Sequence, residues 1–358
     1  MKIAILLGRR SAPTCGVADH SVHLVEALSQ RNDVILMDVH WSERGWPRAM
    51  VALHREYRSN PREWVVLQFT PLAWSERGFP VGALLVAIMT RLSGAKLAII
   101  IHDPIAFTGS RIRDQLRRKS QHAVMRGLVC CAQISFVTLD PRILAWARGR
   151  MRSHLKQLPI GSNFVSPTTQ APKVKQSSFS VLVFGVTKGQ EKKESEDIAK
   201  VMKAVSGEVA ALRVVVMGNG SETVEHALKR LLAGASVGVT TTGVIFPDRV
   251  EYWLSNSDAL LFVRGEVSAR RGTAVAAISH SLPIVGYEGP ETGWPVTEAG
   301  VVLVPRGRWM ELAAALIRLA KDPTSRESLQ ALSRNAFEKY FDWDGIAHRM
   351  EQELRRAL

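Results

Sequence analysis

The segment FVRGEVSARRGTAVAAISHSLPIVG, residues 262–286, contains the end of an apolar run, a polar loop, an alanine-rich helical pattern and the start of a second apolar run. The two apolar runs, at 258–263 and 283–287, are each about as long as one buried strand. A strand, a helix and another strand in this order predict a βαβ unit, whose two strands are parallel. Small residues such as Ala274 and Ala277 would let the helix pack closely on the sheet.

The same alternation continues on both sides of this segment and predicts the α/β class, with parallel sheets covered on both faces. A chain of 358 residues is too long for one ordinary domain of this kind and suits two. The expected strands are 2–7, 34–39, 64–69, 96–101, 133–139, 179–185, 213–218, 239–245, 258–263 and 283–287. The expected helices are 17–30, 48–58, 80–93, 111–126, 141–152, 309–320 and 324–339.

A linker is expected between the two series of strands. From residue 163 the sequence NFVSPTTQAPKVKQSS has no regular periodicity and is rich in Pro, Ser, Thr and Lys. We therefore predict a first domain over residues 1–165, a linker over 166–178 and a second domain over 179–340.

The net charge indicates which partners the protein binds, and the cysteines indicate the redox state of its compartment. The net charge is +14, from 47 Lys and Arg against 33 Asp and Glu, which favours phosphorylated small molecules, anionic lipid or nucleic acid. We expect no nucleic acid partner, because no nucleic-acid-binding signature is present and the aromatic residues are not interleaved with basic ones. Cys15, Cys130 and Cys131 fit neither a disulfide framework nor a zinc site, which indicates the reducing cytoplasm.

The sequence predicts no transmembrane helix but a peripheral contact with a membrane. Residues 1–7 end at two arginines and read as a buried strand, not a signal peptide, and the apolar stretch 79–101 is interrupted by charges. Residues 111–126 form a basic amphipathic pattern suited to an anionic bilayer, with Ile112, Leu116, Ala123 and Val124 on the apolar side. Four aromatic residues in loops would line an acceptor groove, touch lipid headgroups or pack in the core: Trp41, Trp46, Trp74 and Phe79.

Ligands of parallel sheets collect beyond the carboxyl ends of the strands, so the residues that follow each strand are candidate site residues. Arg270, Arg271, Gly272 and Thr273 immediately precede the alanine-rich helix. Two guanidinium groups beside the unpaired amides of a helix N-terminus form a strong anion receptor. This combination predicts a phosphate-binding site.

Three other strand ends carry groups with two interpretations each. Gly16 would let phosphate approach the next helix, or is an ordinary loop glycine. His102 and Asp103 would bind a hydroxyl or phosphate and move a proton, or form a structural histidine with an aspartate cap. Lys192 and Lys193 would neutralise a leaving diphosphate, or form a solvated face.

Taken in order, these motifs resemble the family 4 glycosyltransferases, enzymes of the GT-B fold that retain the anomeric configuration and need no metal. The resemblance extends over essentially the whole chain. Its motifs lie at 15–19, 102–103, 158–163, 185–193, 218–220 and 281–285. The segment 340–343 resembles the point where the last helix of this fold, here 341–358, crosses back to the N-terminal domain.

Several residues depart from the family's pattern. The family carries two glutamates separated by seven residues; here Ala276 occupies the second place, and Glu266 lies two positions from the first. The family's arginine after the first strand of the second domain is replaced by Val186, whereas its lysine matches Lys192. The sequence resembles a branch that reads S-x-R-R-G-[ST], in which one of the two adjacent arginines would supply the missing cation.

The resemblance implies two Rossmann-like domains whose parallel sheets face each other across a cleft that holds a UDP or GDP sugar. The implied donor-binding residues are Gly16, Val17, Lys193, Gly218, Asn219, Gly243, Val244, Ile245, Glu266, Arg270, Gly272 and Thr273, with Glu222 near the nucleoside. The implied catalytic residues are His102, Asp103, Lys192 and Arg271. A hexose would pass with retention to a glycan, polysaccharide or lipid-linked acceptor at the inner face of the membrane, and neither cofactor nor metal is implied.

Other functions fit parts of the same pattern. A different GT-B activity, such as an epimerase or an inverting transferase, would use the same nucleotide site. The missing glutamates also suit a catalytically silent partner that binds nucleotide or another transferase. Donor turnover would separate an enzyme from such a partner, whereas salt-sensitive binding to a duplex would indicate a nucleic-acid binder.

Overall fold

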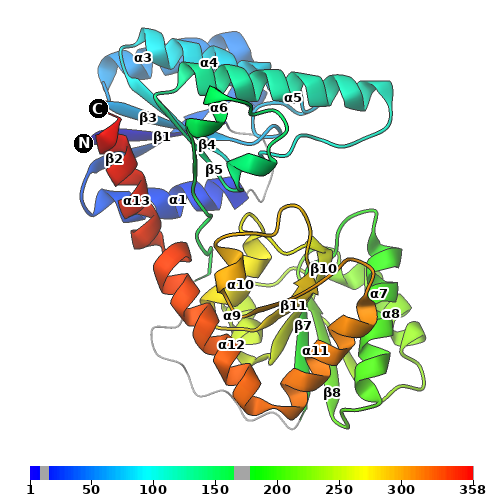
Figure 1. Ribbon diagram of the computed structural model, residues 1–358. Coiled ribbons are helices and arrows are strands. Elements are labelled where there is room, and N and C mark those ends of the chain that lie inside the picture. The colour runs from blue at the N-terminus through cyan, green and yellow to red at the C-terminus, as the bar shows by residue number, and fades with distance from the viewer. Residues whose placement is uncertain (9–15, 165–177, 358) are drawn as a thin grey trace. The chain divides into compact units, whose positions relative to one another are not determined.

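The computed structural model describes residues 1–8, 16–164 and 178–357, which divide into two compact units (Figure 1). Unit 1 comprises Met1–Gly161 and Trp343–Leu358, and unit 2 comprises Ser162–Asp342. The predicted linker at 166–178, apart from its last residue, lies outside the described residues, and so does the segment 9–15.

Unit 1 is built on a parallel sheet of six strands in the order β2-β1-β3-β4-β5-β6. The strands are β1 (Lys2–Gly8), β2 (Asp33–Val39), β3 (Trp64–Phe69), β4 (Lys96–Ile101), β5 (Ile134–Val137) and β6 (Leu155–Gln157). β1, β3 and β4 are central and almost wholly buried, because they carry apolar residues on both faces. Ile3 and Ile5 point into one apolar core, and Ala4 and Leu6 into the other.

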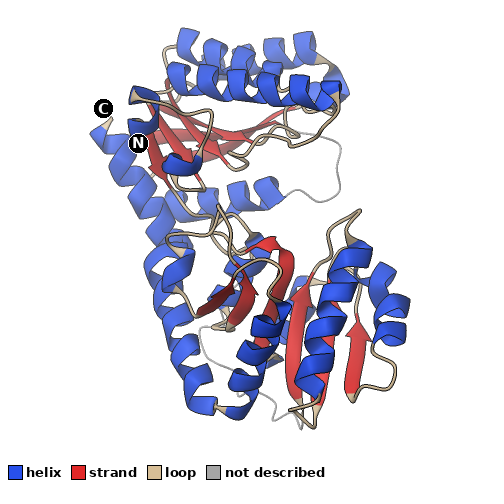
Figure 2. Ribbon diagram, turned by 45° about the vertical axis from the view of Figure 1, so that its right-hand side comes forward, coloured by secondary structure: helices blue, strands red, loops and turns tan. Residues whose placement is uncertain are grey.

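Helices cover both faces of this sheet (Figures 1 and 2). One face packs against α1 (Gly16–Ser29) and α13 (Trp343–Arg356), and the other against α3 (Trp46–Ser59), α4 (Val81–Leu92) and α5 (Ile112–Cys131). The shorter elements are α2 (Trp41–Arg44), η1 (Pro141–Ile143) and α6 (Arg150–Ser153). Within the described ranges, no helix is both long enough and apolar enough to cross a bilayer.

The apolar side predicted for residues 111–126 differs from the buried side of α5. Of the four predicted residues only Val124 is buried, and Ile112, Leu116 and Ala123 are exposed. The helix packs instead through residues of its C-terminal half: Gln121, Val124, Met125, Leu128 and Val129. At 3.6 residues per turn these buried positions lie opposite the three exposed ones. The stronger apolar stripe of the second half therefore sets the rotation of the helix.

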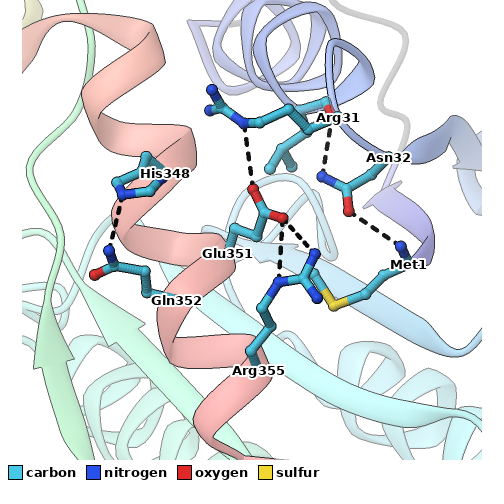
Figure 3. A network of polar contacts seen from close by, with 8 residues as sticks. Met1, Arg31, Asn32, His348, Glu351, Gln352 and Arg355 are labelled. Carbon is cyan, nitrogen blue, oxygen red and sulfur yellow. Dashed lines mark hydrogen bonds and ion pairs between the residues drawn. The ribbon is translucent and has the colours of Figure 1, made fainter.

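The final helix, α13, docks on α1 within unit 1. Four of its residues, Ile346, Ala347, Met350 and Leu354, are buried in the same core as Leu24 and Leu28. At the edge of this core the Glu351 carboxylate accepts a hydrogen bond of 2.7 Å from Arg355 and lies 3.4 Å from the Nε of Arg31 (Figure 3). Burial alone would raise the pKa of Glu351, but the two guanidinium groups hold it below its ordinary value.

The helix predicted at 141–152 is wrong for most of its length. The chain forms the turn η1, then a second turn in which the Ala147 amide donates to the Leu144 carbonyl at 3.0 Å, then the short helix α6. Leu144 and Trp146 are both buried, and the indole N–H of Trp146 donates to the Pro104 carbonyl at 2.8 Å. Two residues that are two positions apart lie on nearly opposite sides of a helix, so burying both favours a break in the helix, here a turn.

Unit 2 contains a second parallel sheet of six strands, in the order β12-β11-β10-β7-β8-β9. The strands are β7 (Phe179–Phe184), β8 (Leu212–Met217), β9 (Val237–Thr241), β10 (Ala259–Glu266), β11 (Ile284–Tyr287) and β12 (Val301–Val304). The helices are α7 (Glu191–Ser206), α8 (Ser221–Leu231), α9 (Pro247–Asn256), α10 (Gly272–Ser279), α11 (Trp309–Lys321) and α12 (Pro323–Ala336), with the turns η2 (Val296–Glu298) and η3 (Phe337–Phe341). α7, α8 and α11 pack on one core of this sheet. The predicted α/β class with two parallel sheets is confirmed.

Candidate functional site

The predicted anion receptor of unit 2 lies at the start of α10, directly after Arg271. The first amides of a helix have no carbonyl partner in their own helix, so this end attracts negative charge. The two adjacent arginines differ in their surroundings. The guanidinium group of Arg270 makes two hydrogen bonds, of 2.7 and 2.6 Å, with the Glu291 carboxylate. Glu291 therefore neutralises Arg270 and leaves Arg271 as the charged group beside the helix start.

A third arginine, Arg264, lies beside Arg271. It comes from the end of β10, and its Nη1 donates to the Phe184 carbonyl at 3.2 Å. Burial lowers the pKa of Arg264, which Glu194 partly offsets, and burial together with Arg270 lowers the pKa of Arg271. The Nε atoms of both side chains are buried without a hydrogen-bond partner among the described residues. Two half-buried cations, each with an unused buried donor, favour an anionic ligand.

Two cavities of unit 2 share Arg264 and Arg271 in their linings. One has a volume of about 350 Å³ and is also lined by Phe262, Gly272 and Thr273. The other has a volume of about 510 Å³ and reaches Thr187, Gln190, Lys193, Glu194, Tyr287 and Arg306. Both volumes are in the range of small-molecule sites. The predicted residues Arg271, Gly272, Thr273 and Lys193 are thus brought to one region, whereas Lys192 is exposed on the first turn of α7.

Glycines join the carboxyl ends of β8 and β9. The amide of Gly218 donates to the Gly243 carbonyl at 2.8 Å, and the amide of Gly243 donates to Ser221 Oγ at 2.8 Å. Gly243 has a φ of +68°, and a Cβ there would collide with the Glu222 carboxylate. Only glycine fits this approach of the β9 backbone to Glu222 without strain. The Asn219 carbonyl accepts from the Val186 amide at 2.9 Å, which holds the β7 and β8 ends together.

The remaining predicted residues of unit 2 lie at neighbouring strand ends. Val244 is exposed beyond Gly243, and Ile245 is half-buried. Glu266 ends β10 and contacts Gly289, where a Cβ would collide with its carboxylate. Glu266 is therefore close to the loop after β11, on the side of the sheet edge where Arg271 lies.

In unit 1, His102 directly follows β4 and is fully buried. Its Nε2 and the Oε1 of Gln68 lie 2.7 Å apart, and because an amide oxygen only accepts, Nε2 carries the proton. Burial lowers the pKa of His102 to about 4, against the opposing charge of Asp103. Thr70 donates its hydroxyl hydrogen to Asp103. His102 is therefore a neutral imidazole at neutral pH, and Asp103 is held by Thr70.

A second buried histidine completes this cluster. The ring of His20 on α1 meets the His102 ring edge to face at 4.6 Å and the Trp343 ring at 4.9 Å. Burial, together with His102, holds the pKa of His20 well below its ordinary value. In the described part of the chain, His20 Nδ1 and Gln68 Nε2 are buried without hydrogen-bond partners. The end of the β3–β4 pair thus holds neutral polar groups with unused hydrogen-bonding capacity.

Gly16 and Val17 form the start of α1. A Cβ on Gly16 would meet no described atom within 4 Å, so packing does not require glycine at this position. The loop before it, at 9–15, lies outside the described residues. Within residues 1–8, 16–164 and 178–357, no group of three His, Cys, Asp or Glu residues is arranged to hold a metal ion.

Three residues of these clusters were not predicted from the sequence as site residues: Arg264, Gln68 and His20. Arg264 and Gln68 are polar residues near the carboxyl ends of otherwise apolar strands, and this signal was available in the sequence. His20 gave no such signal, because only the packing of α1 beside β4 brings it to His102.

We predict that the stability of the protein falls below pH 6.5 because of His102. The unfolded histidine takes up a proton near its ordinary pKa of 6.5, whereas folded His102 resists protonation until about pH 4. The unfolded state then binds more protons, and stability decreases as pH falls. Denaturant unfolding at neutral pH and at about pH 5 should show a pH-dependent loss that is smaller by about 2 kcal/mol in His102→Gln. The exposed control His54→Gln should keep the full loss, and equal losses in both variants would contradict the assignment.

Comparison with known proteins supports the architecture of both units. The family model of the glycosyl transferases group 1 matches residues 178–322, within unit 2. No match is found among curated proteins. Anabaena HepE in complex with UDP is similar in structure, with 13% identity, a TM-score of 0.67, and coverage of 99% of this chain and 100% of that chain.

Two further solved structures are also similar to this chain. Sucrose-phosphate synthase from Thermosynechococcus elongatus has 16% identity and a TM-score of 0.67, and the match covers 99% of this chain and 98% of that chain. UDP-GlcNAc 2-epimerase from Neisseria meningitidis, bound to UDP-GlcNAc, has 11% identity and a TM-score of 0.58, with coverage of 99% and 100%. At these identities the likeness shows the fold alone. The chain has the GT-B fold, and its residues 178–322 match the family model of the group 1 glycosyl transferases.

Proposed function

We propose that this protein is a glycosyltransferase that moves a hexose, with retention, from a UDP or GDP sugar to a glycan, polysaccharide or lipid-linked acceptor. It needs neither metal nor cofactor in this proposal. One observation carries it: the half-buried Arg264 and Arg271 lie together beside the start of α10, in the part of the chain that matches the group 1 glycosyl transferase model. A nucleoside diphosphate supplies the negative charge that these side chains favour.

The two arginines would stabilise the charge that develops on the departing diphosphate. Fixed donors aimed at a developing charge usually give the largest catalytic contribution. The family has an arginine where this chain has Val186. Arg264 would take over its role, because the Arg264 guanidinium lies against the neighbouring Gly185, where an added Cβ would collide with it. Lys193, which lines the cavity, and Lys192 would add charge. A departing phosphate oxygen would act as the base for the incoming acceptor.

The nucleoside would bind at the ends of β8 and β9. Val244 and Phe246 offer apolar surface, being 72% and 81% exposed, and Glu222 offers a carboxylate for ribose hydroxyls. Gly218 and Asn219 bring backbone groups to the same place. An apolar surface beside an acceptor of hydrogen bonds suits a base and its sugar.

Unit 1 would contact the transferred sugar and the acceptor. His102 is neutral, and Gln68 and His20 retain unused hydrogen-bonding atoms. Neutral donors and acceptors suit sugar hydroxyls, in contrast to the cationic cluster of unit 2. The cytoplasm, at the inner face of a membrane, is the proposed place of the reaction.

A second candidate is a catalytically silent partner that binds a nucleotide or another transferase. The observation that favours it is Ala276, which is fully buried where the family's second glutamate would lie. Such a partner would bind the donor and leave it unchanged.

We predict that Arg264→Gln and Arg271→Gln each weaken binding of the nucleoside diphosphate by about 10- to 100-fold, because each loses charge-assisted hydrogen bonds that contribute about 1.5–3 kcal/mol. Calorimetric titration with UDP, GDP and ADP measures this effect and identifies the preferred base.

The matched control is Arg334→Gln, which removes an exposed arginine of α12 and should leave the affinity unchanged. Wild-type affinity in both cavity variants would contradict the proposed diphosphate site, as would a failure of all three nucleotides to bind the wild-type protein.

We also predict that Gly243→Ala weakens nucleotide binding about fivefold, because the new Cβ displaces Glu222, and one lost hydrogen bond is worth about 1 kcal/mol. The control is Gly234→Ala. Gly234 has a similar φ of +80° but open space around its Cα, so this variant has the backbone strain without the collision. Both variants should lose similar stability, and only Gly243→Ala should lose affinity. Equal affinities would remove Glu222 from the site.

A further inference from the structure

Helix α4 has an exposed aliphatic face that is unusual for a helix of a globular protein. Its sequence VGALLVAIMTRL contains a single charged residue, Arg91, and such a composition is typical of a fully buried helix. Only one side of α4 is buried, through Gly82, Ala83, Val86, Ala87 and Thr90. Val81, Leu85, Ile88 and Leu92 are exposed by 52%, 49%, 43% and 83%. Their spacing of four, three and four residues places them in one straight row, called the α4 row below.

The neighbouring helices extend this apolar surface. α4 packs between α3 and α5 in the layer at the top of Figure 1. Val51 of α3 is 51% exposed, and Ile112 and Leu116 of α5 are 78% and 55% exposed. Several large apolar side chains exposed on three adjacent helices mark an interaction surface rather than chance exposure.

The same three helices carry strong positive charge. They contain eight arginines and one lysine, against two acidic residues, Glu56 and Asp114. The cations are Arg48, Arg55, Arg58, Arg91, Arg113, Arg117, Arg118, Lys119 and Arg126. An apolar row flanked by cations is complementary to a bilayer that exposes anionic headgroups above hydrocarbon.

An aromatic pocket is continuous with the N-terminal end of the α4 row. Val81 and Leu85 line this pocket, whose volume is about 810 Å³, together with Trp41, Trp46 and Phe79. The Trp46 ring stacks on Trp41 at 5.4 Å and on Trp74 at 6.5 Å. The indole N–H groups of Trp41 and Trp74 donate to backbone carbonyls, so these side chains present apolar surface to the pocket. Gly82 makes this possible, because a Cβ there would collide with Trp46.

We propose that the α3–α4–α5 face of unit 1 docks on an anionic lipid bilayer, with the α4 row in the acyl–headgroup boundary and the aromatic pocket open to a hydrocarbon chain. The cations of α3 and α5 hold the headgroups. An anionic bilayer matches both parts of this surface, because its hydrocarbon accommodates the aliphatic row and its headgroups pair with the arginines. This inference does not depend on the proposed transferase activity.

The test is flotation of the full-length protein with vesicles of phosphatidylcholine alone or mixed with phosphatidylglycerol. We expect binding to the mixed vesicles, weakened by salt, and little binding to the neutral ones. The variant Leu85→Gln/Leu92→Gln should bind the mixed vesicles at least tenfold more weakly, because it removes two inserting side chains.

The matched control is Met310→Gln/Leu332→Gln, which changes two comparably exposed residues of unit 2, 69% and 47% exposed. It should bind the vesicles as the wild type does. Both double variants should keep the thermal unfolding and the UDP or GDP affinity of the wild type, so failure of docking and failure of the nucleotide site are distinguished.

Two results would overturn the proposal. One is equal vesicle binding by both double variants and the wild type. The other is a wild-type dimer in sedimentation that Leu85→Gln/Leu92→Gln dissociates, because the α4 row would then be covered by a second copy of the chain.

Discussion

Unit 2 is organised around two positive charges that are partly withdrawn from water. Arg264 and Arg271 meet at the carboxyl ends of the sheet, and burial lowers the pKa of both. Several neighbouring features accommodate them. Gly185 leaves room for the Arg264 guanidinium, and Gly265 has a φ of +79° near the end of β10. Glu291 pairs directly with Arg270, although its charge also acts on Arg271. The result is a cluster of two cations, not three, and their unused donors suit the charge of a diphosphate.

The polar cluster of unit 1, in contrast, is neutral. His102 and His20 are buried and neutral, and Gln68 holds His102 in one tautomer. No net charge is needed to bind sugar hydroxyls, whereas charge is needed to bind phosphate. The two strand-end clusters thus differ in charge, one being cationic and the other neutral. This difference explains why the same βαβ architecture gives different chemistry in the two units: the residues after the strands differ, not the sheets.

The sequence predicted the class, the parallel sheets and most of the strands, because buried parallel strands are continuous apolar runs. It failed where packing overrides a local pattern. Residues 141–152 have helical periodicity, but the burial of both Leu144 and Trp146 is met by a turn at 144–147 that interrupts the helix. β6 has three residues, too few for a recognisable pattern, whereas β12 was missed although its four residues form an apolar run. Among the site residues, the sequence indicated Arg271 and His102 from their places after strands. It could not show that Glu291 neutralises Arg270, or that α1 brings His20 to His102, because both depend on contacts between distant segments.

In the proposed reaction, this GT-B protein cleaves the bond between a sugar and a nucleoside diphosphate. The most direct measurement is to incubate the purified protein with UDP and GDP sugars and to follow the products by NMR spectroscopy. We predict release of UDP or GDP, with the transferred or freed sugar first appearing in the anomeric configuration of the donor. An intact donor that nevertheless binds would contradict catalysis and favour a silent partner, and an epimerised nucleotide sugar without diphosphate release would show a different GT-B reaction.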